Sequence, residues 1–167
     1  MDTANTVSNS GEKEVNKRLL INAVKLEDKL INNYDELINR ASLNNIKDIL
    51  IGLAERERKD KRAMQSIIRK GGSVAHLLRE DKATDLQMFD HQLSEDVNSI
   101  DAVDTNSVLA VVRYSLKEIS GLVSIFDLIR EEYDGGTKKL FTMLYNSKLK
   151  TKKKLENFLD SIYYNNR

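Results

Sequence analysis

The chain has 167 residues, the size of one domain, and this length is enough to bury a substantial core. It contains no proline and only seven glycines, which favours long helices over a sheet with many tight turns, so we expect an all-α protein. The net charge of +1 gives no global attraction to nucleic acid or membranes, and the lack of cysteine excludes disulfides, thiolate metal sites and iron–sulfur clusters.

Residues 1–11 are polar and contain no apolar run long enough for a signal peptide or a membrane span of ~20 residues. We interpret them as a disordered tail, residues 12–163 as one helical domain and residues 164–167 as a second tail. Together with the missing cysteine, these features favour a cytoplasmic protein without membrane contact.

A first helix is predicted over residues 12–41, because one face repeats at spacings of three and four. Glu27 is the only charged residue on that face, and Tyr34 on the same face is most simply a core residue. The face consists of Leu20, Ala23, Glu27, Leu30, Tyr34, Leu37 and Ala41.

A second helix is predicted over residues 45–70, and Asn44 or Asn45 is the expected N-cap. Its inward face carries Glu57 and Asp60, three residues apart and therefore on neighbouring turns. Two acidic residues thus occupy a helix face whose other residues are apolar and predict core.

The segment 72–105 has only short apolar groups, so we expect a crossover connection with one or two short helices. It contains both histidines of the chain, His76 and His91. We interpret them as linker or surface residues rather than metal ligands or catalytic bases.

A third helix is predicted over residues 106–133, after a capping region that ends at Ser107, and Glu118 lies on its inward face. This helix is also apolar outside that face, so it should be covered on more than one side. We therefore expect a homodimer, paired through exposed apolar surface on the third helix or on the first hairpin.

The last helix is predicted over residues 137–163, with Thr137 as its N-cap and Lys148 and Thr151 on its inward face. In all four helices the polar inward residues lie near the midpoint. Antiparallel helices of similar length bring their midpoints to one level, so these side chains should converge. The predicted cluster is Glu27, Glu57, Asp60, Glu118, Lys148 and Thr151.

A glutamate on each of two helices and a Glu-x-x-His on each of the other two form the ligand set of di-iron carboxylate bundles. The chain resembles the ferritin-like superfamily, and within it the rubrerythrin-like di-iron domain, over roughly Lys17 to Tyr163. The resemblance implies a ferritin-like antiparallel four-helix bundle with a long crossover between the second and third helices. It is carried by Ala23, Glu27 and Tyr34, by Leu53, Ala54, Glu57 and Asp60, by Phe89, Asp90, His91 and Leu93, by Glu118, and by Lys139, Leu140, Phe141 and Leu144.

The resemblance also implies which ligand positions are changed. The first-helix and third-helix glutamates correspond to Glu27 and Glu118. In the second helix Asp60 stands where the family has histidine. In the fourth helix Lys148 and Thr151 replace both ligands, so the metal positions are vestigial.

Lys148 cannot coordinate a metal while protonated, and we hypothesise that its ammonium substitutes for one by pairing with Glu57, Glu27 or Glu118. The first interpretation is a protein that has lost its di-iron centre, holds no cofactor and acts as a non-catalytic structural or interaction module, with an unknown protein as a partner. The alternative is an oxidoreductase for iron or peroxide chemistry, with iron or manganese on a reduced site of carboxylates formed by Glu27, Glu57, Asp60 and Glu118.

Other interpretations stay open at this level. A shift of the helical phase by one residue would turn Glu27 and Glu118 to solvent. Glu57 and Asp60 can also be a solvated pair that belongs to the charged outer face of their helix. Lys148 can also extend along the surface with its charge in water. The lysines between 148 and 154 are interpreted as a solvated helix face, and we expect no nucleic-acid binding.

Overall fold

The computed structural model describes residues 15–70, 87, 89, 91–93 and 100–165. This part of the chain is all-α, and none of its residues lies in a strand. No helix within it is both long enough and apolar enough to cross a membrane. The four long helices are α1 (Lys17–Arg40), α2 (Asn44–Arg69), α5 (Val108–Glu132) and α6 (Gly135–Asn165).

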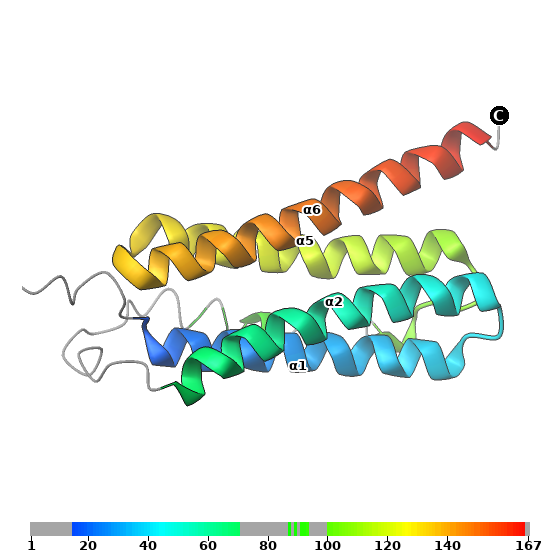
Figure 1. The fold of residues 1–167 in the computed structure, drawn as a ribbon. Helices are drawn as coiled ribbons and strands as arrows, with labels where there is room; N and C mark the ends of the chain where they lie inside the picture. Colours follow the sequence, from blue (N-terminus) through cyan, green and yellow to red (C-terminus); the bar gives the residue numbers. More distant parts are fainter. Residues whose placement is uncertain (1–14, 71–86, 88, 90, 94–99, 166–167) are drawn as a thin grey trace, which may run out of the picture.

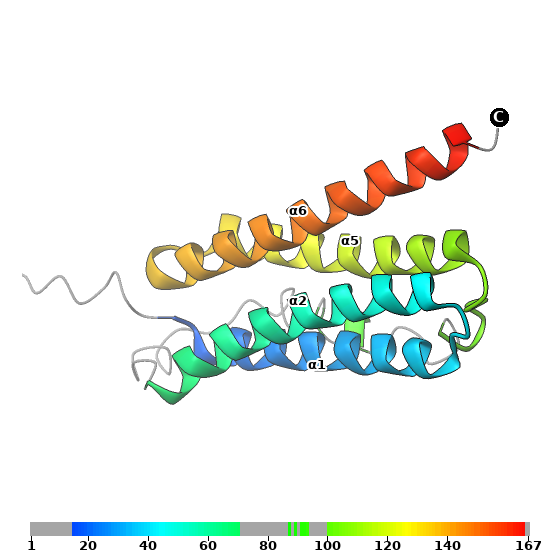
Figure 2. The same ribbon diagram turned by 45° about the vertical axis from the view of Figure 1, so that its right-hand side comes forward.

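The helices form two antiparallel hairpins, α1 with α2 and α5 with α6, and these two pairs make the most extensive contacts (Figure 1). Figures 1 and 2 show the hairpins lying against each other, with α6 moving away from the other helices toward its C-terminus. Apolar side chains from all four helices belong to one continuous core. The polar residues discussed below lie within this core.

Side-chain caps set two of the helix starts. The Asn16 carboxamide accepts a hydrogen bond from the Leu19 N–H at 3.2 Å, so α1 begins at Lys17 and not at residue 12. The Ser107 hydroxyl accepts from the Ala110 N–H at 3.2 Å, as the capping region before the third helix predicted.

Two predicted caps are wrong. Leu43 occupies the N-cap position of α2 without a side-chain cap, and Asn44 is already helical. Helix α6 begins at Gly135, whose φ of 65° lies in the left-handed region that glycine adopts without strain. The Thr137 hydroxyl therefore lies inside the helix and accepts the N–H of Asn16 at 2.8 Å, which ties the starts of α1 and α6 together.

Parts of the predicted crossover contribute to the core. Phe89 is fully buried, and Ile100 and Val103 near its end are also buried. The guanidinium of Arg40 donates to the carbonyl oxygens of Ile100 and Val103, each at 2.8 Å. His91 is exposed at the surface, whereas the other histidine, at position 76, lies outside the described residues.

The apolar surface of α5 is covered by the chain itself. Val112, Ile119 and Phe126, which lie outside its predicted inward face, are all fully buried. This surface is therefore not free to pair with a second copy, contrary to one of the two dimer surfaces suggested by the sequence.

The C-terminal tail predicted from residue 164 is shorter than expected, because α6 continues to Asn165. The tail predicted at residues 1–11 lies outside the described residues.

Candidate functional site

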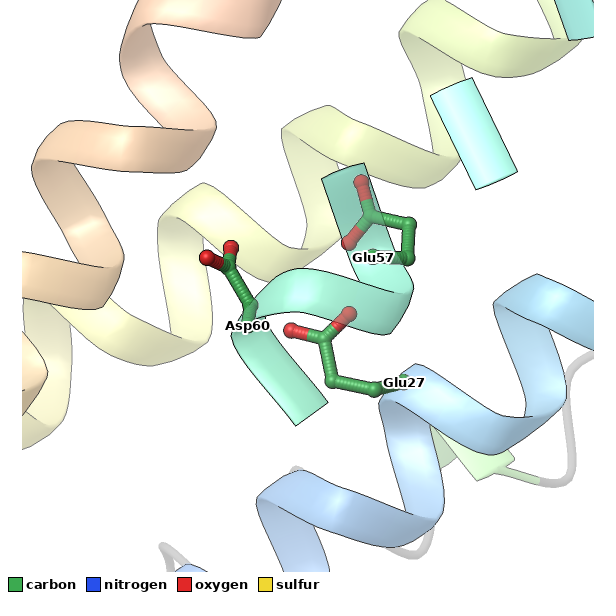
Figure 3. Close-up of side chains that lie close together, drawn as sticks. All are labelled: Glu27, Glu57 and Asp60. Carbon is green, nitrogen blue, oxygen red and sulfur yellow. The ribbon is translucent and has the colours of Figure 1, made fainter. Parts of the chain in front are cut away.

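The ammonium of Lys148 lies among three carboxylates in the interior of the protein. The side chain is 1% exposed, and its Nζ lies 2.8 Å from Glu27 Oε1 and 2.9 Å from Asp60 Oδ2. It also donates a hydrogen bond to Glu57 Oε2. Figure 3 shows the three carboxylates close together, Glu27 from α1 and the other two from α2. One side chain of α6 thus links both helices of the opposite hairpin.

Helical spacing explains how the cluster forms. Glu57 and Asp60 lie three residues apart and so share one face of α2, opposite Glu27 on α1. The hydroxyl of Ser147, next to Lys148, donates to Asp60 Oδ2 at 3.1 Å. Sequence reasoning missed Ser147 because adjacent helical residues ordinarily point to different sides.

Thr151 is buried beside the cluster, but its hydroxyl forms hydrogen bonds with other groups. Its hydroxyl donates to the Ser147 carbonyl oxygen at 3.3 Å and accepts from Arg56 Nη1 at 3.3 Å. The exposed Arg56 thereby connects α2 with α6.

Glu118 does not join the three carboxylates. Each of Glu27, Glu57 and Asp60 offers an oxygen within 4.8 Å of the others, and Glu118 is not a member of this group. It is half-buried and lies between α5 and α1, where it lines a small cavity with Lys29 and Gln92. Glu27 and Glu57 are partners of Lys148, as the sequence predicted. The third partner is Asp60 and not Glu118.

The burial of the cluster decides between the interpretations left open by the sequence. Glu27 and Glu57 are both fully buried, so neither belongs to a solvated face. Lys148 is also buried and its charged end lies inside, so it does not extend along the surface.

The carboxylates keep Lys148 charged. Burial alone would lower the pKa of its ammonium, but the negative charges of Glu27, Glu57 and Asp60 outweigh that effect and raise the pKa above its ordinary value. An ammonium has no free lone pair, so it donates hydrogen bonds and cannot bind a cation.

At Glu27 the effect of burial on the pKa outweighs the effect of the neighbouring positive charge. Burial raises the pKa of its carboxyl well above the ordinary value of 4.5, Lys148 opposes this shift, and the neighbouring Glu57 adds to it. Three carboxyl groups face one ammonium, so negative charge is in excess when all are ionised. Burial therefore favours the protonated form of the Glu27 carboxyl.

Several buried polar atoms around the cluster lack a well-aligned hydrogen bond within the described part of the chain. They are both carboxyl oxygens of Glu27, Glu57 Oε1, the Tyr34 hydroxyl and the Ser115 hydroxyl. Glu27 Oε1 is within ion-pair distance of Lys148 but is not aligned as an acceptor. Burial, followed by the charge of Glu57, raises the pKa of Tyr34, so its phenol stays neutral. A buried polar surface of this kind ordinarily holds ordered water or an ion.

The donor set does not fit an iron or manganese centre in this arrangement. The three carboxylates supply hard oxygen ligands, but the Lys148 ammonium occupies the space that they share. A cation there would lie against an ammonium, and the described residues around it include no histidine. The cluster is an internal ion-pair network.

Changing Glu27 to glutamine should remove a pH-dependent destabilisation. Because the folded pKa of Glu27 is raised, its contribution to stability is complete below pH 4.5 and is lost as the pH rises through the folded pKa. We expect E27Q to gain stability over the wild type as the pH rises above 4.5, by at most about 1.4 kcal/mol per pH unit. Urea unfolding at several pH values measures this, with exposed Glu36→Gln on α1 as the control. A difference that stays constant with pH would contradict it.

Comparison with known proteins gives no family assignment: no family model, no curated protein and no solved structure matches the chain.

Proposed function

We propose that the chain is a ferritin-like antiparallel four-helix bundle, similar to rubrerythrin-like proteins, that has lost its di-iron centre and acts as a non-catalytic structural or interaction module. The observation that supports this most strongly is the position of Lys148. Its ammonium pairs with Glu27 and Glu57, the residues that correspond by resemblance to metal ligands.

The arrangement of the helices supports the fold part of the proposal. Two antiparallel hairpins are separated in the chain by a long segment, and polar residues from three helices meet inside one core. This is the layout in which bundle proteins build metal sites from side chains of facing helices.

The chemistry of the cluster supports the absence of catalysis. An ammonium supplies a fixed positive charge and hydrogen bonds to carboxylates, so it can offset their burial as a cation would. It offers no open coordination position and no change of oxidation state. A bundle with this substitution keeps one positive charge among its carboxylates but has no redox chemistry there.

A metal-binding oxidoreductase with a site of carboxylates is the second candidate. It is favoured by the carboxyl oxygens of Glu27 and Glu57 that accept no well-aligned hydrogen bond and by the excess of carboxylates over ammonium groups. For iron or manganese to bind there, Lys148 would have to leave the cluster. Such a site would perform iron or peroxide redox chemistry.

Metal content tests the choice between these functions. Purified protein is incubated anaerobically with Fe²⁺ or Mn²⁺, desalted and analysed for metal, beside a Glu57→Ala/Asp60→Ala variant. We expect less than 0.1 metal ion per chain (on the order of background) in both, because the ammonium occupies the shared space. About one metal ion per chain that the double variant loses would instead establish the oxidoreductase candidate.

A further inference from the structure

Helix α6 is longer than its hairpin partner. It has 31 residues whereas α5 has 25. At 1.5 Å per residue the difference is about 9 Å of helix. In Figure 1 the C-terminal end of α6 rises away from α5 and α2, and the Arg113 guanidinium of α5 lies 5.7 Å from the centre of the Tyr163 ring. Arg113 also donates a hydrogen bond to the Tyr163 hydroxyl, so the end of α6 is connected to α5, whereas Tyr164 next to it is exposed.

A groove lies where α6 separates from the first half of α2. Its cavity has a volume of about 250 Å³. Gly52 lies in the groove, and a Cβ atom added there would meet nothing within 4 Å. The groove is lined by Asp48, Ile49, Gly52, Leu53, Arg56, Thr151, Lys154, Leu155 and Phe158.

The groove is suited to a helix better than to a small molecule. Ligand pockets usually enclose ~300–1,000 Å³ and bury most of the ligand. This groove is smaller, and Gly52, Arg56 and Lys154 along it are exposed. Apolar side chains in an open groove between two helices form the surface on which an amphipathic helix packs.

Exposed apolar side chains gather around the same end of the molecule. Five of the seven large exposed apolar residues of the described part belong to the first half of α2, with the residue before it, or to the last third of α6. These are Leu43, Ile51, Phe158, Tyr163 and Tyr164. Tyr164 is the most exposed, at 73%. Such a concentration is typical of a surface that pairs with another protein.

The end of α6 has the features that the groove requires in a partner helix. Phe158 is exposed and Ile162 is half-buried, and they lie four residues apart on one face, the spacing that anchors of a groove-binding helix have. Asp160 beside them makes no ion pair with any described residue, and neither does Lys154 at the groove. Arg56, fixed by its hydrogen bond to Thr151, adds a second positive charge there.

We propose that two copies of this chain form a twofold dimer in which the last turns of each α6 pack into the α2–α6 groove of the other copy. Both copies use the same surface, which contains the groove and the helix end that fills the partner's groove. The assembly therefore stops at two chains. Asp160 of one copy then faces Lys154 of the other. This inference rests on the dimer expected for an interaction module, and it is independent of whether the polar cluster binds metal.

Gly52→Glu tests the groove without weakening the single chain. Glutamate is a better helix former than glycine, and it stands four residues before Arg56, the favourable order for an ion pair. In the proposed dimer the new carboxylate also fills the groove and repels Asp160 of the other copy. We expect light scattering to give the mass of two chains for the wild type and of one chain for G52E, with an equal or higher melting temperature.

Met143→Glu is the matched control, since it removes an exposed apolar side chain from the first half of α6, away from the groove. It should leave the dimer intact. A monomeric wild type at 100 µM, on the order of the concentrations at which weak dimers form, would overturn the dimer itself. A dimer that persists in G52E would overturn this surface, whatever the metal analysis gives.

A charge exchange tests the pairing of the two copies. Lys154→Glu and Asp160→Lys should each raise the dimer dissociation constant about tenfold in low salt, and the double variant should restore it. Both substitutions lie on exposed side chains, so folding is preserved and is checked by circular dichroism. Sedimentation measures the constants. Single variants without effect, or a double variant no tighter than the single variants, would overturn the twofold arrangement.

Discussion

Replacing Lys148 with methionine should lower the free energy of unfolding by about 3 to 5 kcal/mol at pH 7, the usual loss when one partner of a buried ion pair is removed. Methionine has nearly the same shape as the lysine side chain, so the loss reports the missing charge and not a cavity. It arises because Glu27 and Glu57 stay buried without a positive charge beside them. Chemical denaturation with a two-state fit measures it.

The pH dependence distinguishes this loss from poor packing. Because burial already raises the pKa of Glu27, the variant can relieve its excess negative charge by protonation. The loss should therefore be smaller at pH 5 than at pH 7, by about 1 kcal/mol or more. Lys153→Met, at an exposed position on the same helix, is the control. An unchanged or raised melting temperature for Lys148→Met would show that the ion-pair network does not stabilise the fold.

Restoring the family's ligands should convert the cluster into a metal site. The triple variant Asp60→His, Lys148→Glu and Thr151→His gives both α2 and α6 a Glu-x-x-His pair and removes the competing ammonium. We expect it to retain Fe²⁺ or Mn²⁺ after desalting. With metal at 100 times its dissociation constant, binding should stabilise the fold by about 2.7 kcal/mol. Metal analysis and thermal unfolding with and without metal measure both effects.

The matched control adds Glu57→Ala to the triple variant, which removes one ligand from the rebuilt set. It should lose most of the bound metal and the stabilisation. Without metal the triple variant should be less stable than the wild type, because its buried carboxylates lack a counter-charge. A folded triple variant that retains no metal would contradict the proposed relation to di-iron bundles.

The sequence by itself determined the helices and most of the polar cluster. Spacings of three and four placed Glu27, Glu57 and Lys148 on faces that were otherwise apolar, and each side chain is buried in the structure. These predictions succeed because burial on one face of a helix leaves a periodic pattern in the chain. The predicted all-α class follows from the same pattern and from the lack of proline.

The ends of the helices were less determined by the sequence. Asn44 and Asn45 are both good caps, yet α2 begins at Asn44 with Leu43 in the cap position. Thr137 has the right chemistry for a cap, but its hydroxyl accepts the N–H of Asn16 from the start of α1. At Thr137 a strong local preference is thus overruled by a contact that forms only when the helices pack.

Only the tertiary structure decided which carboxylate joins Lys148, because that choice depends on how each helix is rotated about its axis. Asp60 contacts the ammonium, whereas Glu118 lies between α5 and α1. The raised pKa of Glu27 also requires the folded protein, since it depends on burial and on the distances to neighbouring charges. The groove beside Gly52 likewise exists only because α6 diverges from α2, and helix separation leaves no mark in a residue pattern.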